Sequence, residues 1–108
     1  MHYVVFFGFD KANITPKAQT VLDSLADQIK NAGSVELRVS GYADRAGPKP
    51  YNQRLSQQRA AAVVADLKRM GVSARIQQQA FGETQPLVPT ADGVREPRNR
   101  RVEIDIRK

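Results

Sequence analysis

An aspartate and an arginine, Asp44 and Arg59, are the residues whose types and spacing most clearly indicate binding chemistry. Asp44 follows a strand-like run and stands just before a loop rich in Gly and Pro, residues 46–50. Arg59 lies on or beside the apolar stripe of the helix predicted after that loop. A guanidinium in such a place is costly unless an anionic group meets it. The two side chains could pair with each other across the loop, or together hold a ligand that carries both an ammonium and a carboxylate.

Other kinds of site chemistry find little support in the sequence. The only histidine, His2, is next to the chain end, and the chain has no cysteine. Neither a Ser-His nor a Cys-His nucleophile therefore has a credible base, and thiolate metal ligands are excluded. The 11 acidic residues are scattered singly rather than clustered as a metal site requires. We predict no catalytic residues, no metal and no cofactor.

Length and composition predict one globular domain over residues 1–108. A chain of 108 residues with 41% hydrophobic and 26% charged residues can bury a single core. No stretch approaches the roughly 18 consecutive apolar residues of a membrane-spanning helix. The net charge of +6 favours an anionic partner, such as nucleic acid, an acidic polymer or the peptide carboxylates of a bacterial cell wall.

The spacing of apolar residues predicts the elements that position Asp44 and Arg59. Four runs have the composition or alternation of strands: residues 3–7, 35–41, 74–81 and 102–107. Two stretches have helical spacing, one capped by Thr15 and closed by Gly33, the other running from about residue 51 to residue 70. The order βαβαββ predicts an α+β fold, a two-layer α/β sandwich with a mixed four-stranded sheet and both helices on one face.

Three sequence blocks resemble those of a known family. The first block spans residues 41–60 and consists of G-Y-A-D, a Gly/Pro loop and Y-N-Q-R-L-S-Q-Q-R-A. The second is F-D-K-A-N-I at residues 9–14, and the third joins G-E-T-Q-P at residues 82–86 to N-R-R-V-E-I at residues 99–104. In order and separation they resemble the OmpA-like C-terminal domain, the peptidoglycan-binding module of Gram-negative envelopes. The resemblance covers nearly the whole chain and implies the sandwich predicted above, with the last strand between the first two.

The resemblance also implies binding roles for individual residues. Asp44 takes the position that holds the amino group of meso-diaminopimelate in the stem peptide of peptidoglycan, and Arg59 the position that binds its carboxylate. Asn52, Arg100 and Asp10 fall at further positions around the same cleft. Considered without the resemblance, Asn52 fits a helix-start cap, Arg100 a solvated charge at a strand end and Asp10 an ordinary turn residue.

The chain departs from the family pattern around this cleft. Tyr42-Ala43 replaces the usual His-Thr, so a hydroxyl donor is lost and Ala43 is expected to contribute a backbone contact only. The usual Gly-Arg of the long loop, residues 82–98, reads Arg95-Glu96 here.

The resemblance implies non-catalytic binding of the stem peptide, which would tether an outer-membrane or envelope protein to the cell wall. The domain would then be periplasmic and attached through an N-terminal part outside this sequence. One alternative is a nucleic-acid-binding module that uses the five arginines between residues 95 and 107. The strands lack interleaved exposed aromatics and no nucleic-acid module motif occurs, so nucleic acid is not the expected partner. The other alternative is a stator-type domain of the same fold that anchors a membrane motor.

Overall fold

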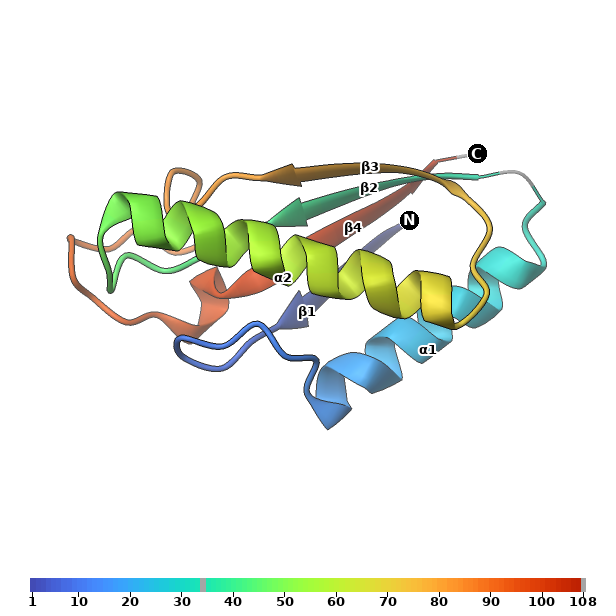
Figure 1. Cartoon of the computed structure of the whole chain (residues 1–108), viewed down its shortest axis with the longest axis horizontal. Helices are drawn as coiled ribbons and strands as arrows, with labels where there is room; N and C mark the ends of the chain where they lie inside the picture. The colour runs from blue at the N-terminus through green and yellow to red at the C-terminus, as the bar shows by residue number, and fades with distance from the viewer. Residues whose placement is uncertain (34, 108) are drawn as a thin grey trace.

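The predicted sheet and helices are present in the computed structural model, which describes residues 1–33 and 35–107. Figure 1 shows β1 (His2–Phe6), α1 (Pro16–Lys30), β2 (Glu36–Gly41), α2 (Lys49–Arg69), β3 (Arg75–Ala80) and β4 (Arg101–Arg107), with a short 3-10 helix η1 (Pro97–Asn99) before β4. The strands form one sheet in the order β1-β4-β2-β3. β4 is antiparallel to both of its neighbours, whereas β2 and β3 are parallel. The α+β sandwich is therefore confirmed, and the last strand lies between the first two.

The core lies between the sheet and the two helices, which cover the same face of it (Figure 1). The alternation predicted for β2 and β4 holds, because Leu37 and Val39 of β2 and Val102 and Ile104 of β4 are all fully buried. The helical stripes supply the opposite layer, including Leu22, Leu25, Val63 and Leu67. Within the described residues, neither helix has the length and apolarity that crossing a membrane requires.

The helix ends agree only in part with the sequence prediction. Thr15 caps α1 through its side chain, as predicted, but α1 ends before Gly33 is reached. α2 begins at Lys49, earlier than predicted, with Pro50 in its first turn. The expectation that residues 46–50 exclude a helix is therefore wrong for the last two of them. The first turn of a helix has no intrahelical acceptor for its N–H groups, so proline is tolerated there.

The end of β2 lies unusually close to α2, and Gly41 makes this possible. A Cβ on Gly41 would lie 2.0 Å from the carbonyl oxygen of Ser56 and 3.2 Å from the Cβ of Ala60. The 2.0 Å contact with a backbone oxygen cannot occur, so only glycine allows the strand to approach the helix backbone. The close approach places Arg59 of α2 directly beside the chain that leaves β2.

Three loops gather at one end of the sheet. The arrowheads of β1, β2 and β3 all point toward that end, and β4 starts from it (Figure 1). The loops that follow β1 and β2, and the long loop between β3 and β4, therefore meet there. Asp44 and Arg59 belong to this end of the molecule.

Candidate functional site

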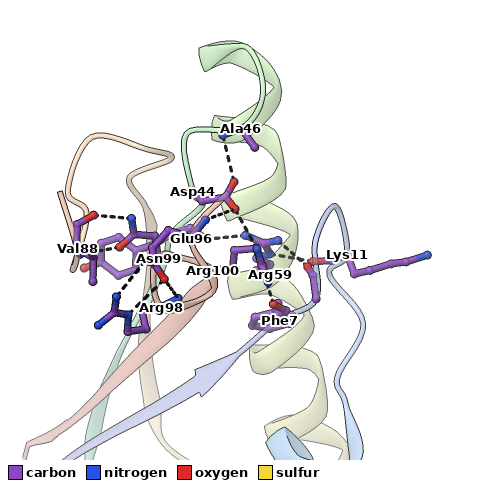
Figure 2. A network of polar contacts seen from close by, with 12 residues as sticks. Phe7, Lys11, Asp44, Ala46, Arg59, Val88, Glu96, Arg98, Asn99 and Arg100 are labelled. Carbon is purple, nitrogen blue, oxygen red and sulfur yellow. Dashed lines mark hydrogen bonds and ion pairs between the residues drawn. The ribbon is translucent and has the colours of Figure 1, made fainter. Parts of the chain in front are cut away.

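Arg59 is completely buried at the loop end, and its direct partners are backbone carbonyls (Figure 2). Its Nε donates to Lys11 O at 2.8 Å, Nη1 to Tyr42 O at 3.0 Å and Nη2 to Gly8 O at 3.2 Å. The guanidinium also lies 5.5 Å from the centre of the Phe7 ring. Across the part of the chain that the structure describes, no carboxylate forms an ion pair with it. Arg59 is thus a buried cation contacted only by neutral groups.

Burial determines the electrostatics of this arginine. The pKa of Arg59 is lowered to about 10, chiefly by desolvation, and the positive charge of Arg100 acts in the same direction. The nearby carboxylates of Asp44 and Asp10 act in the opposite direction. The guanidinium therefore remains charged at neutral pH, with two carboxylates near it but not bonded to it. An added anion would meet a positive charge that is not yet neutralised by direct contact.

Asp44 pairs with Arg100 rather than with Arg59. Its carboxylate is buried and accepts hydrogen bonds from the N–H groups of Ala46 and Glu96, each at 3.2 Å. Nη1 of Arg100 lies 3.2 Å from the same carboxylate. The two side chains point toward each other in Figure 2. The alternative in which Asp44 and Arg59 simply neutralise each other across the loop is therefore not what the structure contains. Arg100 is likewise not a solvated charge, because its side chain is only 12% exposed.

A small cleft opens beside Asp44. It is lined by Phe9, Asp10, Asp44, Ala46, Gly47, Tyr51, Asn52 and Leu55. Its volume of about 40 Å³ suits one small polar group rather than a sugar. Three of the predicted site residues, Asp10, Asp44 and Asn52, thus share one cleft. Arg59 does not line it and lies one helical turn beyond Leu55, behind the loop that supplies the carbonyls of Gly8 and Lys11.

Asn52 is buried in the cleft wall and is not the cap of α2, a place that Pro48 holds. Its Nδ2 donates to Gly47 O at 2.9 Å and to Glu83 Oε1 at 3.0 Å. Its Oδ1 accepts no hydrogen bond from the residues that the structure describes. The amide nitrogen is therefore occupied, and the amide oxygen is the atom that a ligand could use.

Asp10 and Ala43 differ in how they relate to the cleft. Asp10 is exposed and has a φ of 59°, the one positive φ at a residue other than glycine among residues 1–33 and 35–107. Asp10 lies in a turn, where aspartate adopts positive φ more readily than most residues, so this conformation agrees with the turn alternative as well as with a place in the cleft. Ala43 is buried, and its N–H donates to Gly82 O at 2.9 Å. That N–H is therefore not free to contact a ligand.

Glu83 is a site residue that the sequence analysis did not single out. This buried carboxylate accepts from Asn52 on one oxygen and from Arg45 Nε on the other, each at 3.0 Å. Arg45 in turn pairs with Asp92 and donates to Thr90 O. These contacts hold the long loop against the cleft. Glu83 is the acidic residue of the G-E-T-Q-P block, and that block was the available signal.

A second contact orders the long loop farther along. Asn99 is fully buried, and its side chain exchanges two hydrogen bonds with the backbone of Val88, both at 2.8 Å (Figure 2). The amide thereby satisfies one backbone donor and one backbone acceptor inside an irregular segment. Within the described residues, no group of side chains could hold a metal ion.

The fold and site can now be compared with known proteins. The model of the OmpA family matches residues 6–100. Outer membrane protein A of Shimwellia blattae is 39% identical over 115 residues, which cover 95% of this chain and 48% of that protein. The crystal structure of the peptidoglycan-associated lipoprotein from Burkholderia pseudomallei superimposes with a TM-score of 0.87 and 27% identity, covering 96% of this chain and 89% of that one. A MotB-like protein from Desulfovibrio vulgaris gives a TM-score of 0.78 and 26% identity, covering 98% and 72% of the two chains.

The match is to one part of longer proteins. The chain spans between 13% and 53% of the length of four curated relatives that it matches. Within this chain, in contrast, the family model covers β2, β3, both helices and the loops around the cleft, whereas β4 and all of β1 except Phe6 lie outside the matched residues. On the sequence blocks, the strand order and this match, the chain belongs to the OmpA family.

Proposed function

We propose that this domain binds peptidoglycan without cleaving it and holds the protein of which it is part on the cell wall. Membership of the OmpA family supports this, as does the likeness to a peptidoglycan-associated lipoprotein. The single observation that carries the proposal is Arg59, a fully buried cation with only neutral direct partners beside a cleft lined by carboxylates.

The ligand group that fits this charge arrangement is the side-chain end of meso-diaminopimelate, which carries an ammonium and a carboxylate on one carbon. The ammonium would enter the cleft between Asp10 and Asp44, where the free Oδ1 of Asn52 offers one more acceptor. The carboxylate would turn toward Arg59. Charge-assisted hydrogen bonds of this kind are stronger than neutral ones.

Binding in this manner requires the loop of residues 8–11 to move away from Arg59. Two of the three carbonyls that accept from Arg59 belong to this loop, those of Gly8 and Lys11. The loop also contains Asp10 with its positive φ. We expect the incoming carboxylate to replace at least one of these carbonyls, because a guanidinium bonds more strongly to a charged acceptor than to a neutral one.

Titration of the protein with two stem peptides tests the proposal. A peptide with lysine in place of meso-diaminopimelate keeps the ammonium but lacks the carboxylate. A charged hydrogen bond contributes about 1.5–3 kcal/mol, so the diaminopimelate peptide should bind on the order of tenfold to a hundredfold more tightly. Amidation of that carboxylate should weaken binding in the same direction. Equal affinities would refute the two-group arrangement and leave only attraction to a chain of net charge +6.

Co-sedimentation with purified sacculi, in parallel with a nucleic-acid shift assay, tests the broader function. We expect binding to sacculi, no shift of nucleic acid at physiological salt, and muropeptides returned unchanged after incubation. A shift that weakens steeply with added salt would instead support the nucleic-acid alternative. Products of cleavage or transfer would support an enzyme.

Outer membrane protein A and a peptidoglycan-associated lipoprotein are among the similar proteins, so we propose a periplasmic location for this domain. The likeness to a MotB-like protein favours a second candidate, a motor-anchoring domain with the same ligand. The two candidates differ in what precedes the domain in the parent protein, and sequencing the complete gene distinguishes them.

A further inference from the structure

Arg95 of the long loop stacks on Phe9, a residue that lines the cleft. The Cζ of Arg95 lies 3.6 Å from the centre of the Phe9 ring. Phe9 belongs to the loop after β1, whereas Arg95 precedes Glu96, whose N–H donates to Asp44. The stack therefore joins two separate loops beside the cleft that Asp44 and Phe9 line.

The stack on Phe9 positions the guanidinium of Arg95 without using its hydrogen-bond donors. The residue is exposed, and no carboxylate or carbonyl among residues 1–33 and 35–107 accepts a hydrogen bond from it. Stacking on an aromatic face leaves the N–H groups at the edge of the guanidinium free to donate. Because the stack already restricts the side chain, less conformational entropy is lost when an anion binds.

Phe9 lines the cleft and carries Arg95 on its ring, so a ligand that extends out of the cleft past Phe9 would meet Arg95. Asp44 and Arg59 account for the ammonium and carboxylate at the far end of meso-diaminopimelate, and the rest of the stem peptide extends outward. The α-carboxylate of the glutamyl residue that precedes diaminopimelate is the next anionic group toward the N-terminus of that peptide. In some cell walls this group is an amide, which has the same shape but no charge.

We propose that Arg95 is a specificity-determining residue that binds this second carboxylate and so distinguishes the free acid from the amide. The inference rests on the proposed function and adds to it a choice between two forms of the same stem peptide. A planar guanidinium can make two parallel hydrogen bonds to a carboxylate, whereas an amide offers one acceptor atom and no charge.

The test compares two tripeptides, L-Ala-γ-D-Glu-meso-diaminopimelate with the glutamyl α-carboxylate free or amidated, by calorimetric titration. The wild type should prefer the free acid by about tenfold, which corresponds to about 1.4 kcal/mol. Arg95→Gln should reduce that preference to within about twofold, chiefly by weakening the free acid. Arg75→Gln is the matched control, because it removes the same charge from an exposed position at the start of β3. It should keep the full preference.

Two further variants test the role of the stack. Phe9→Leu removes the aromatic face while keeping Arg95, and it should lower the preference for the free acid. Arg95→Lys keeps the positive charge but lacks the planar guanidinium. This variant should retain only part of the preference for the free acid. If Arg95→Gln and Arg75→Gln show the same preference as the wild type, the inference is wrong while the proposed function stands. If the wild type binds neither tripeptide, the proposed function itself fails.

Discussion

Two arginines are buried at the loop end of this domain, and their surroundings differ. Arg101 of β4 is 4% exposed and lies over the Tyr42 ring at 3.8 Å, with its Nε 2.6 Å from Glu103. One of its Nη atoms donates to Gln85 O, and the other has no partner within the described residues. Arg59 is equally buried but bonds only to backbone carbonyls.

Tyr42 touches both arginines, through its backbone oxygen to Arg59 and through its ring to Arg101. The difference between them is the carboxylate. Arg101 is neutralised by Glu103, two residues along the same strand, so the fold itself accounts for its burial. Arg59 has no bonded carboxylate within the described residues, and we propose that its charge serves a ligand. Burial alone therefore does not mark a binding arginine, and a buried arginine without a bonded counter-ion is the stronger candidate.

The largest effect that separates the two arginines should come from Arg59→Leu. We expect sacculus binding to fall by more than about a hundredfold, since the ligand carboxylate would be desolvated without a partner. Arg101→Leu should leave binding within about threefold of the wild type, because its charge is already paired. Co-sedimentation measures both variants. Equal losses in the two would mean that net charge, not the position of Arg59, controls binding.

The same substitution should also lower stability. Arg59→Leu leaves the carbonyls of Gly8, Lys11 and Tyr42 without their donor, and each buried acceptor left unsatisfied costs about 1–3 kcal/mol unless water reaches it. Thermal unfolding should therefore be measured for each variant. The binding assay is then run at a temperature where both variants are folded.

A smaller loss of binding should follow from Asp44→Asn. The amide keeps the size of the side chain and can still accept from the Ala46 N–H, but the charge that attracts an ammonium is gone. We expect about tenfold weaker binding of both the diaminopimelate and the lysine peptide, because the ammonium is common to them. Asp27→Asn is the control, since Asp27 is an exposed carboxylate on α1, away from the three loops. If the control weakens binding equally, the effect of Asp44 is not local.

The smallest effect on binding should come from Tyr42→Leu. This change removes the aromatic ring that stacks on Phe81, with ring centres 5.4 Å apart, and that Arg101 covers. It keeps the backbone oxygen that accepts from Arg59. We expect the free energy of unfolding to fall by about 1–2 kcal/mol and the binding affinity to change less than about twofold. Urea denaturation and peptide titration measure the two quantities. Lost binding at unchanged stability would show that the ring belongs to the site.

The layers of this fold could be predicted because the spacing of apolar residues along the chain determines which faces of the strands and helices are buried. Leu37 and Val39 face the helices on one strand, Val102 and Ile104 on another, and each pair alternates with polar residues. The place of β4 inside the sheet does not follow from that spacing. It came from the resemblance between sequence blocks, and the strand register confirms it.

The polar contacts of the site could be predicted only in part. Asp44 was expected beside Arg59, yet its bonded cation is Arg100, 56 residues away, because β4 starts at the same end of the sheet. The partners of Arg59 are backbone carbonyls, which every residue possesses and no sequence pattern marks. The contact between Glu83 and Asn52 depends likewise on how the long loop folds back.

The position of the cleft relative to the chain ends has a mechanical consequence. The N–H of Ile106 donates to Met1 O at 2.9 Å, so Met1 and the last residues of β4 lie at the end of the sheet opposite the three loops. A pull between a wall-bound ligand at the loops and a polypeptide joined at Met1 would run nearly along the strands. The hydrogen bonds between β1 and β4 would then be sheared together rather than peeled apart one after another.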